Sequence, residues 1–180
     1  MTSFTAARSM PADARTALEH QFDRLLTENK FALVRLAGGY TNSASDRDDL
    51  LQNIALSIWQ ALPGFRGECS ERTFVFRIAH NRAITYLARN RSRFAVVEDD
   101  LELPDTGLNP EAALVREEQE GRLAGAVRAL PIPYRQVVLL MLEDMEYNEI
   151  ALILGISESN VGVRLSRARQ MLRKIMEGRP

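Results

Sequence analysis

The sequence has little of what many enzymes and secreted proteins require. Among 180 residues there are one cysteine, Cys69, and two histidines, His20 and His80. A disulfide within the chain is therefore impossible, and no zinc-type cluster can be assembled. We interpret Cys69 as a loop residue without chemistry and His80 as a surface histidine. No carboxylate pair, activated nucleophile or glycine-rich phosphate loop stands out, so we expect no enzyme, cofactor or metal.

Long apolar runs are also missing. The first 20 residues lack the continuous apolar core of a secretion signal, and no stretch approaches the roughly 20 apolar residues that a membrane helix needs. We therefore expect a cytoplasmic chain without membrane insertion. The composition, 46% hydrophobic and 26% charged, is typical of a soluble globular chain with one moderate or two small domains.

The net charge of -1 conceals an uneven distribution of charge. Seven arginines and only two glutamates lie between Arg66 and Arg93, whereas residues 94–121 carry nine acidic side chains and the single Arg116. The C-terminal segment turns basic again after Arg164. Because phosphate binding depends on local clusters of Lys and Arg, this pattern favours a polyanionic partner despite the neutral sum.

Apolar residues at helical spacing predict an all-α protein. The expected helices cover residues 12–36, 45–62, 72–91, 111–130, 134–145, 147–154 and 157–176. Ser45 and Asp48 have the spacing of a capping box at the start of the second helix. Residues 94–110 are acidic, lack helical period and contain two prolines, which is typical of a linker. We therefore predict two small helical domains, 12–93 and 111–180, joined by an acidic linker.

The last two predicted helices have the proportions of a helix-turn-helix. Gly155 lies in the turn, where a positive φ is favourable, and Ser157 is placed to cap the second helix. One side of that helix collects the apolar residues expected in the core: Val161, Leu165, Ala168, Leu172 and Ile175. The other side collects side chains that suit base edges and phosphates: Ser159, Asn160, Val163, Arg164, Ser166 and Arg167. Arginine-rich terminal helices also occur for solubility alone, but the turn favours duplex DNA binding.

The helix over residues 72–91 carries a second candidate surface. Phe74, Arg77, Asn81 and Arg82 lie away from its main apolar face, and an aromatic ring among cations is typical of single-strand binding. Burial of Phe74 by the neighbouring loop is an equally open alternative.

The helix over residues 45–62 carries a third candidate surface. Asp49, Gln52 and Leu56 share the side away from the core, and such a mixed strip suits docking on another protein. A solvated face with one stray leucine is the alternative.

Three segments together resemble a known family: "DRDDLLQNIALSIWQALPGFRG", "ERTFVFRIAHNRAITYLARNRSR" and "LPIPYRQVVLLMLEDMEYNEIALILGISESNVGVRLSRARQMLRK". In this order, and around an acidic linker, they are similar to the extracytoplasmic-function (ECF) sigma factors of the sigma-70 superfamily. The resemblance covers nearly the whole chain after about residue 20. Many members carry tryptophan at the position of Phe74, and a basic residue and a serine at Gly162 and Val163.

The resemblance implies a transcription initiation factor whose partners are RNA polymerase core, promoter DNA and an anti-sigma factor. It implies that one surface docks on the polymerase clamp helices: Asp48, Asp49, Gln52, Asn53 and Leu56. A second surface would bind and open the minus-ten element as a single strand: Arg66, Ser70, Phe74, Arg77, Asn81 and Arg82. The helix-turn-helix would read the minus thirty-five element as duplex. The helix over 147–154 lacks the usual serine cap, so we expect its start to fray.

Two other classes of protein stay open on the residues alone. One is a helix-turn-helix regulator that does not bind polymerase core, which would usually bring a receiver or ligand-binding domain upstream. The other is a helical adaptor whose basic helices contact acidic proteins. Promoter-specific RNA synthesis with added polymerase core would separate all three.

Overall fold

The computed structural model describes residues 12–90 and 121–177, and all regular structure in them is helical, as predicted. The elements of the N-terminal half are α2 (Ala12–Gly38), α3 (Ala44–Ala61), the 3₁₀ turn η1 (Leu62–Gly64) and α4 (Glu71–Arg89). The C-terminal half contains a helix over residues 121–129, then α7 (Ile132–Met141), α8 (Tyr147–Leu154) and α9 (Glu158–Met176). The expected linker over residues 94–110 lies outside the described residues.

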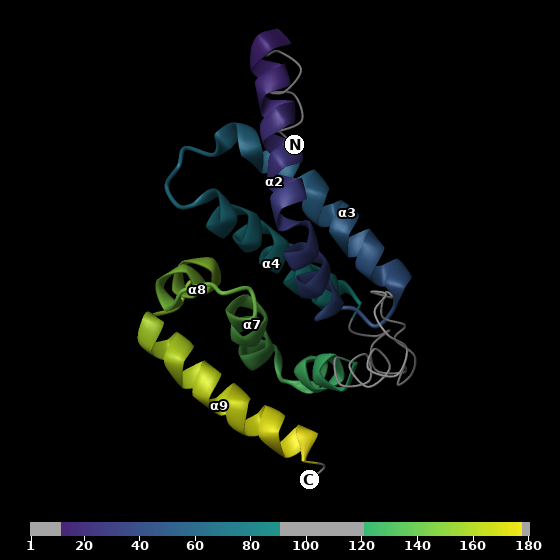
Figure 1. Cartoon of the computed structure of the whole chain (residues 1–180), viewed down its shortest axis with the longest axis vertical. Coiled ribbons are helices and arrows are strands. Elements are labelled where there is room, and N and C mark those ends of the chain that lie inside the picture. Colours follow the sequence, from purple (N-terminus) through teal and green to yellow (C-terminus); the bar gives the residue numbers. More distant parts are fainter. Residues whose placement is uncertain (1–11, 91–120, 178–180) are drawn as a thin grey trace, which may run out of the picture.

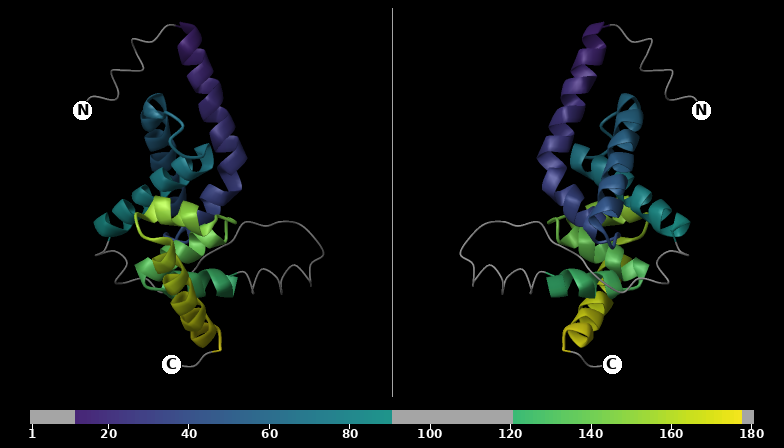
Figure 2. Two further views of the ribbon diagram at one scale, coloured as in Figure 1. Left: turned by 90° about the vertical axis from the view of Figure 1, so that its left-hand side faces the viewer. Right: turned by 90° about the vertical axis from the view of Figure 1, so that its right-hand side faces the viewer.

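The N-terminal half is a bundle of α2, α3 and α4, and the start of α2 projects beyond its neighbours (Figures 1 and 2). Leu50, Ile54 and Ile58 form the buried side of α3. Burying each such side chain contributes about 1.5–3 kcal/mol. None of the described helices is long and apolar enough to cross a bilayer.

The cap of α3 differs from the prediction. Ser43 is the N-cap, with extended backbone, and its Oγ accepts a hydrogen bond from the Asp46 N–H at 3.1 Å. The predicted box of Ser45 and Asp48 is therefore wrong. The buried Tyr40 and Thr41 fix where the chain leaves α2, so the helix begins before Ser45.

The segment between α7 and α8 is a turn, not the helix predicted as far as residue 145. Asp144 has a φ of 54°, and Met145 is buried. The expected fraying after this turn is also wrong. Glu146 and Glu149 form a reciprocal capping box at the start of α8, because glutamates satisfy the free N–H groups in place of a serine.

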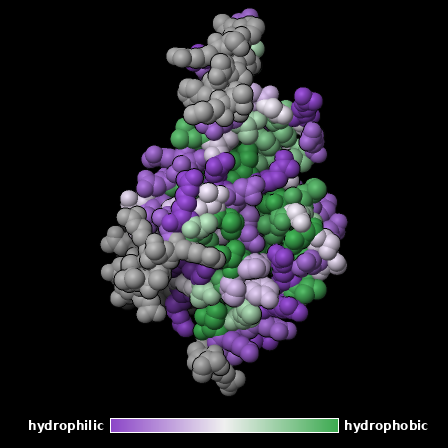
Figure 3. Space-filling model, turned by 180° about the vertical axis from the view of Figure 1, so that it is seen from behind, coloured by the Kyte–Doolittle hydropathy of each residue, from purple (hydrophilic) through white to green (hydrophobic). Residues whose placement is uncertain are grey.

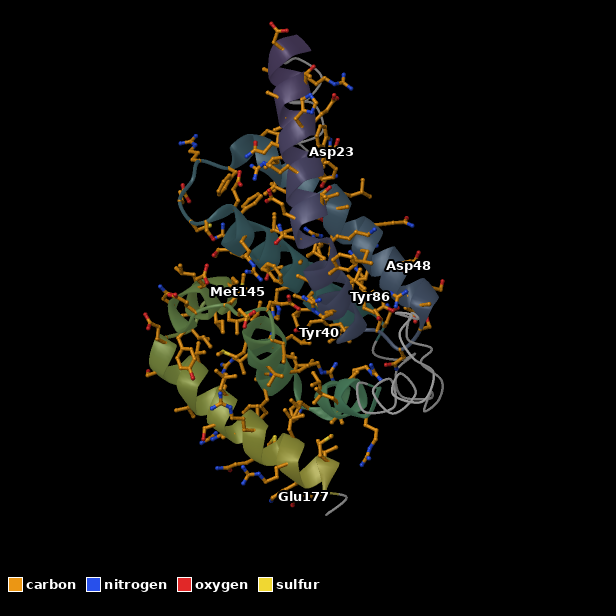
Figure 4. The ribbon with its side chains drawn as sticks, in the orientation of Figure 1. Asp23, Tyr40, Asp48, Tyr86, Met145 and Glu177 are labelled. Carbon is orange, nitrogen blue, oxygen red and sulfur yellow. The ribbon has the colours of Figure 1, made fainter. Side chains whose placement is uncertain are left out.

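His80 lies in the core and not at the surface as predicted, being only 2% exposed. The segment just after α2 covers it: Tyr40 Oη lies 3.4 Å from His80 Nδ1 (Figure 4 labels Tyr40). Burial lowers the pKa of His80 to about 4. Its Nε2 has no hydrogen-bond partner within the described residues.

The two halves pack directly against each other, α8 on α4 and α7 on α2. Their buried side chains form one continuous cluster, to which Tyr40 and Met145 belong. At the end of α2 the backbone of Gly39 approaches Leu139 so closely that a Cβ there would lie 2.6 Å from Leu139 Cδ2. Glycine therefore allows α2 and α7 to meet at this point.

Candidate nucleic-acid interface

The turn between α8 and α9 is built from local signals. Gly155 ends α8 with a φ of 66°, a left-handed conformation that favours glycine. Ser157 is the N-cap of α9, and its Oγ accepts from the Asn160 N–H at 3.3 Å. Both predictions are confirmed, and together they set the direction in which α9 leaves the turn.

The two sides of α9 separate as the sequence predicted, except at the far end. Val161, Leu165 and Ala168 are buried against α7 and α8. Leu172 is half-buried, whereas Ile175 is 42% exposed and does not belong to the core as expected. Ile175 lies in the last turn of α9, and the C-terminal end of that helix extends past the helices that cover its start (Figure 1).

The outer side of α9 presents the residues predicted to read duplex DNA. Ser159, Asn160, Ser166 and Arg167 are exposed, and Val163 is exposed by 50%. Arg164 is half-buried, and its Nε donates to Asn160 Oδ1 at 3.0 Å. Arg167 forms no ion pair within the described residues. A row of short polar side chains beside an exposed guanidinium can donate to base edges and phosphates.

The candidate single-strand surface lies on α4 and the loop before it. Its exposed members are Arg66, Ser70, Arg77, Asn81 and Arg82. Ser70 is also the N-cap of α4, and its Oγ accepts from the Thr73 N–H at 3.0 Å. None of the three arginines forms an ion pair with a carboxylate in residues 12–90 or 121–177, and all three side chains are exposed.

Phe74 is the exception on this surface. It is only 6% exposed, and its ring packs on that of Phe65, with the centroids 4.5 Å apart. Of the two alternatives for Phe74, the structure therefore shows burial by the neighbouring loop. A base has no access to its ring here, so we correct its placement on an exposed stacking surface.

The third candidate surface lies on α3. Asp48, Asp49, Gln52 and Asn53 are exposed, and Leu56 is exposed by 59%. The Asn53 side chain donates to the Asp49 carbonyl, which keeps it along the helix. A leucine in a row of polar side chains offers one partner protein both an apolar contact and hydrogen bonds.

The sequence analysis missed the polar contacts between the halves. Arg35 in α2 forms an ion pair with Glu143, and Thr73 in α4 donates to Glu149. Arg35 and Glu143 are 108 positions apart, and no short-range pattern links them. Within the described residues, no three His, Cys, Asp or Glu side chains are grouped to hold a metal ion.

Comparison with known proteins finds relatives for both halves. A family model described as "Sigma-70 region 2" matches residues 25–93, and one described as "Sigma-70, region 4" matches residues 120–172. The RNA polymerase sigma factor YlaC of Bacillus subtilis is 32% identical over 139 residues, which cover 76% of this chain and 80% of YlaC. The ECF RNA polymerase sigma-E factor of Escherichia coli strain K12 is 29% identical over 161 residues, or 84% of each chain.

A solved structure supports the fold. The sigma factor RpoE of Bartonella quintana, in a co-crystal with the anti-sigma factor NepR, superposes with a TM-score of 0.69. The superposition covers 87% of this chain and 97% of RpoE at 19% sequence identity. Because both halves match in the order of a sigma factor, neither a lone helix-turn-helix regulator nor an adaptor explains the chain. It belongs to the sigma-70 family, as an RNA polymerase sigma factor of the ECF type.

Proposed function

We propose that the chain directs RNA polymerase core to specific promoters and assists their opening, with the contacts divided among α3, α4 and α9. The two functional units are residues 12–93 and 111–180, joined by the acidic segment 94–110. The proposed role is one of binding and not of catalysis, and its place of action is the cytoplasm.

In this proposal α9 reads the minus thirty-five element in the major groove. The observation that carries it is the clean division of α9 into a side buried at Val161, Leu165 and Ala168 and an outer side open to solvent. Val163 is suited to the methyl group of thymine, and Arg167 to the edge of guanine. The phosphates flanking the groove would meet the exposed Arg169 and Arg173.

The proposed contact with the minus-ten element lies on α4. Opening a duplex requires that unstacked bases are bound better than paired ones. Arg77, Asn81 and Arg82 offer exposed donors along one side of the helix, and Arg66 and Ser70 extend this row into the preceding loop. Phe74 can take part only if the loop that carries Phe65 moves away from it.

The proposed protein partners are polymerase core and an anti-sigma factor. The exposed strip of Asp48, Asp49, Gln52, Asn53 and Leu56 supports docking of α3 on core. The co-crystal of RpoE with NepR supports the anti-sigma factor. Hydrophobic side chains occur in patches among hydrophilic ones on the face shown in Figure 3, which suits a chain with several protein contacts.

Transcription in vitro tests this function directly. The purified chain is added to bacterial polymerase core on a library of genomic DNA fragments, and the RNA 5′ ends are sequenced. We expect starts at defined positions that share upstream sequence elements. Starts that are absent, or the same as those of core alone, would refute the proposal.

A further inference from the structure

Two side chains of α9 are joined by a hydrogen bond that runs along the helix. Arg164 Nε donates to Asn160 Oδ1 at 3.0 Å, one helical turn away. Because an arginine has only donors, the Asn160 amide must turn its oxygen toward Arg164. Among residues 12–90 and 121–177, Arg164 forms no ion pair with a carboxylate. Its Nε is used by Asn160, so contact with a ligand falls to Nη1 and Nη2.

The pair lies at one edge of the outer side of α9. This helix runs along one border of the molecule, in yellow in Figure 1. At about 100° per residue, Asn160 and Arg164 lie about 100° and 60° around the helix from Val161, in the same direction. Val161 is fully buried, Arg164 is half-buried and Asn160 is exposed. The exposed Val163 lies about 160° from Val161 and marks the centre of the outer side.

The position of the pair favours a phosphate over a base as its ligand. A helix in the major groove turns the centre of its outer side to the bases and its edges to the two sugar–phosphate backbones. The exposed Arg169 and Arg173, proposed above to meet phosphates, lie on the opposite edge, about 80° and 120° from the same buried valine. To reach a base, the Arg164 guanidinium would have to swing toward the centre of the outer side. Its bond to Asn160 opposes this movement.

We propose that Arg164 binds a backbone phosphate of the minus thirty-five duplex through Nη1 and Nη2, and that Asn160 is a positioning residue for it. The inference rests on the proposed function, since it concerns the same helix in the same groove. A guanidinium matches a phosphate with two parallel hydrogen bonds. A free arginine side chain loses rotamer freedom when it binds, and the bond to Asn160 removes part of this cost in advance.

This phosphate contact carries no sequence information of its own. It fixes how far and at what angle α9 enters the groove, and so sets the register in which Val163 and Arg167 meet the bases. Together with Arg169 and Arg173 on the other edge, Arg164 holds the helix between the two backbones. Asn160 then acts on DNA binding only through Arg164.

Binding of the full chain to short DNA duplexes tests the pair. Fluorescence anisotropy measures the affinity at several salt concentrations for a duplex of arbitrary sequence. Once a promoter is mapped, a duplex with its minus thirty-five element is measured beside it. The variants are Asn160→Ala, Arg164→Ala, Arg164→Lys and the double variant Asn160→Ala with Arg164→Ala. The matched control is Gln170→Ala, which removes an exposed amide of the same helix that lies outside the bonded pair.

The variants at position 164 test the phosphate contact. Arg164→Ala should weaken binding to both duplexes alike, by about tenfold or more, and the slope of log affinity against log salt should fall by about 0.9. Arg164→Lys should keep the slope, because the charge remains. It should still lose about 3–10-fold in affinity, because lysine has no Nε donor that Asn160 can hold. An unchanged salt slope in a folded Arg164→Ala chain would overturn the phosphate contact.

The variants at position 160 test the positioning role. Asn160→Ala should weaken binding to both duplexes by about 3–10-fold without changing the salt slope, since no charge is removed. In a chain that already carries Arg164→Ala it should have no further effect, whereas Gln170→Ala should have the same effect in both backgrounds. A further loss in the double variant, or a loss confined to the promoter duplex, would show that Asn160 contacts DNA itself and overturn the positioning role.

All variants should retain the helical circular dichroism of the wild type. Ser157 caps α9 through the backbone N–H of Asn160, which the substitution keeps. A loss of affinity with intact helicity is therefore a loss of contact and not of fold.

The pair and the proposed function can fail separately. If the pair is wrong, Asn160→Ala binds duplexes as the wild type does while transcripts still begin at defined promoters. If the function is wrong, no defined starts are found, yet the salt slope and the double variant on the arbitrary duplex still report on the pair. A wild-type chain that binds neither duplex at low salt would overturn the inference.

Discussion

The phenol of Tyr40 and the imidazole of His80 face each other in the core, with Tyr40 Oη 3.4 Å from His80 Nδ1 and the two rings at 79°. Burial lowers the pKa of His80 from 6.5 to about 4. The unfolded chain therefore takes up a proton at His80 as the pH falls below about 6.5, whereas the folded chain resists it until near pH 4. The neutral imidazole is the form that the fold requires.

The first prediction concerns the pH dependence of stability. Neutral His80 makes its full contribution to the free energy of unfolding above pH 6.5. That contribution decreases by up to about 3 kcal/mol as the pH falls to 4. Urea unfolding at several pH values measures it as the difference in pH dependence between wild type and His80→Gln. The same substitution at the exposed His20 is the control and should retain the wild-type profile. Parallel profiles for wild type and His80→Gln would contradict the prediction.

The second prediction concerns the cap of α3. Ser43→Ala should lower the free energy of unfolding by about 1 kcal/mol, because the Asp46 N–H loses its acceptor. Ser45→Ala should leave it nearly unchanged, because Ser45 is exposed in the first turn. Chemical denaturation of the two variants compares them directly. If Ser45→Ala lost more stability than Ser43→Ala, the N-cap would be Ser45, as the sequence alone predicted.

The third prediction concerns duplex recognition. Once promoters have been mapped, Arg167→Ala should weaken binding to the minus thirty-five duplex by about 1–3 kcal/mol and relax the preference at one base pair. Arg169→Ala, an exposed arginine of the same helix, should weaken binding to all sequences alike. Fluorescence anisotropy with matched and scrambled duplexes separates the two effects. If Arg167→Ala weakened binding to the matched and the scrambled duplex equally, Arg167 would contact only phosphate and no base.

The fourth prediction concerns docking on polymerase. Replacing Asp49 and Gln52 together with alanine should weaken association with core by about tenfold or more, while the helical content stays the same. Gln60, which is exposed near the end of α3, provides the control substitution. Titration of core with labelled chain reports the affinity. Unchanged association of the double variant would remove this surface from the proposal.

The parts that could be predicted from sequence are those set within a few residues. Gly155 and Ser157 define the turn before α9, and helical spacing alone separates Val161 and Leu165 from the exposed Val163. Ser43 and Ser45 both suit a cap, and only the burial of the preceding residues decides between them. Local patterns therefore describe the surfaces of single helices well.

The parts that could not be predicted depend on residues far apart in the chain. His80 is buried because Tyr40, in the segment after α2, lies against it. Phe74 is buried because the ring of Phe65, in the loop before α4, packs on its ring. Glu143 pairs with Arg35, which lies 108 positions away in the sequence. From the sequence alone, the acidic side chain of Glu143 would therefore be placed on a solvated face. The sequence of a helix specifies which side is apolar, but not which other element meets it.

The pairing of a buried Glu143 with a largely exposed Arg35 has a consequence for variation among relatives. Loss of the carboxylate leaves an arginine that water can hydrate, whereas loss of the arginine leaves an anion stranded in the interior. In relatives whose two halves pack as they do here, we expect the carboxylate at position 143 to be replaced before the arginine at position 35. Where neither charge is present, we expect both positions to have changed together.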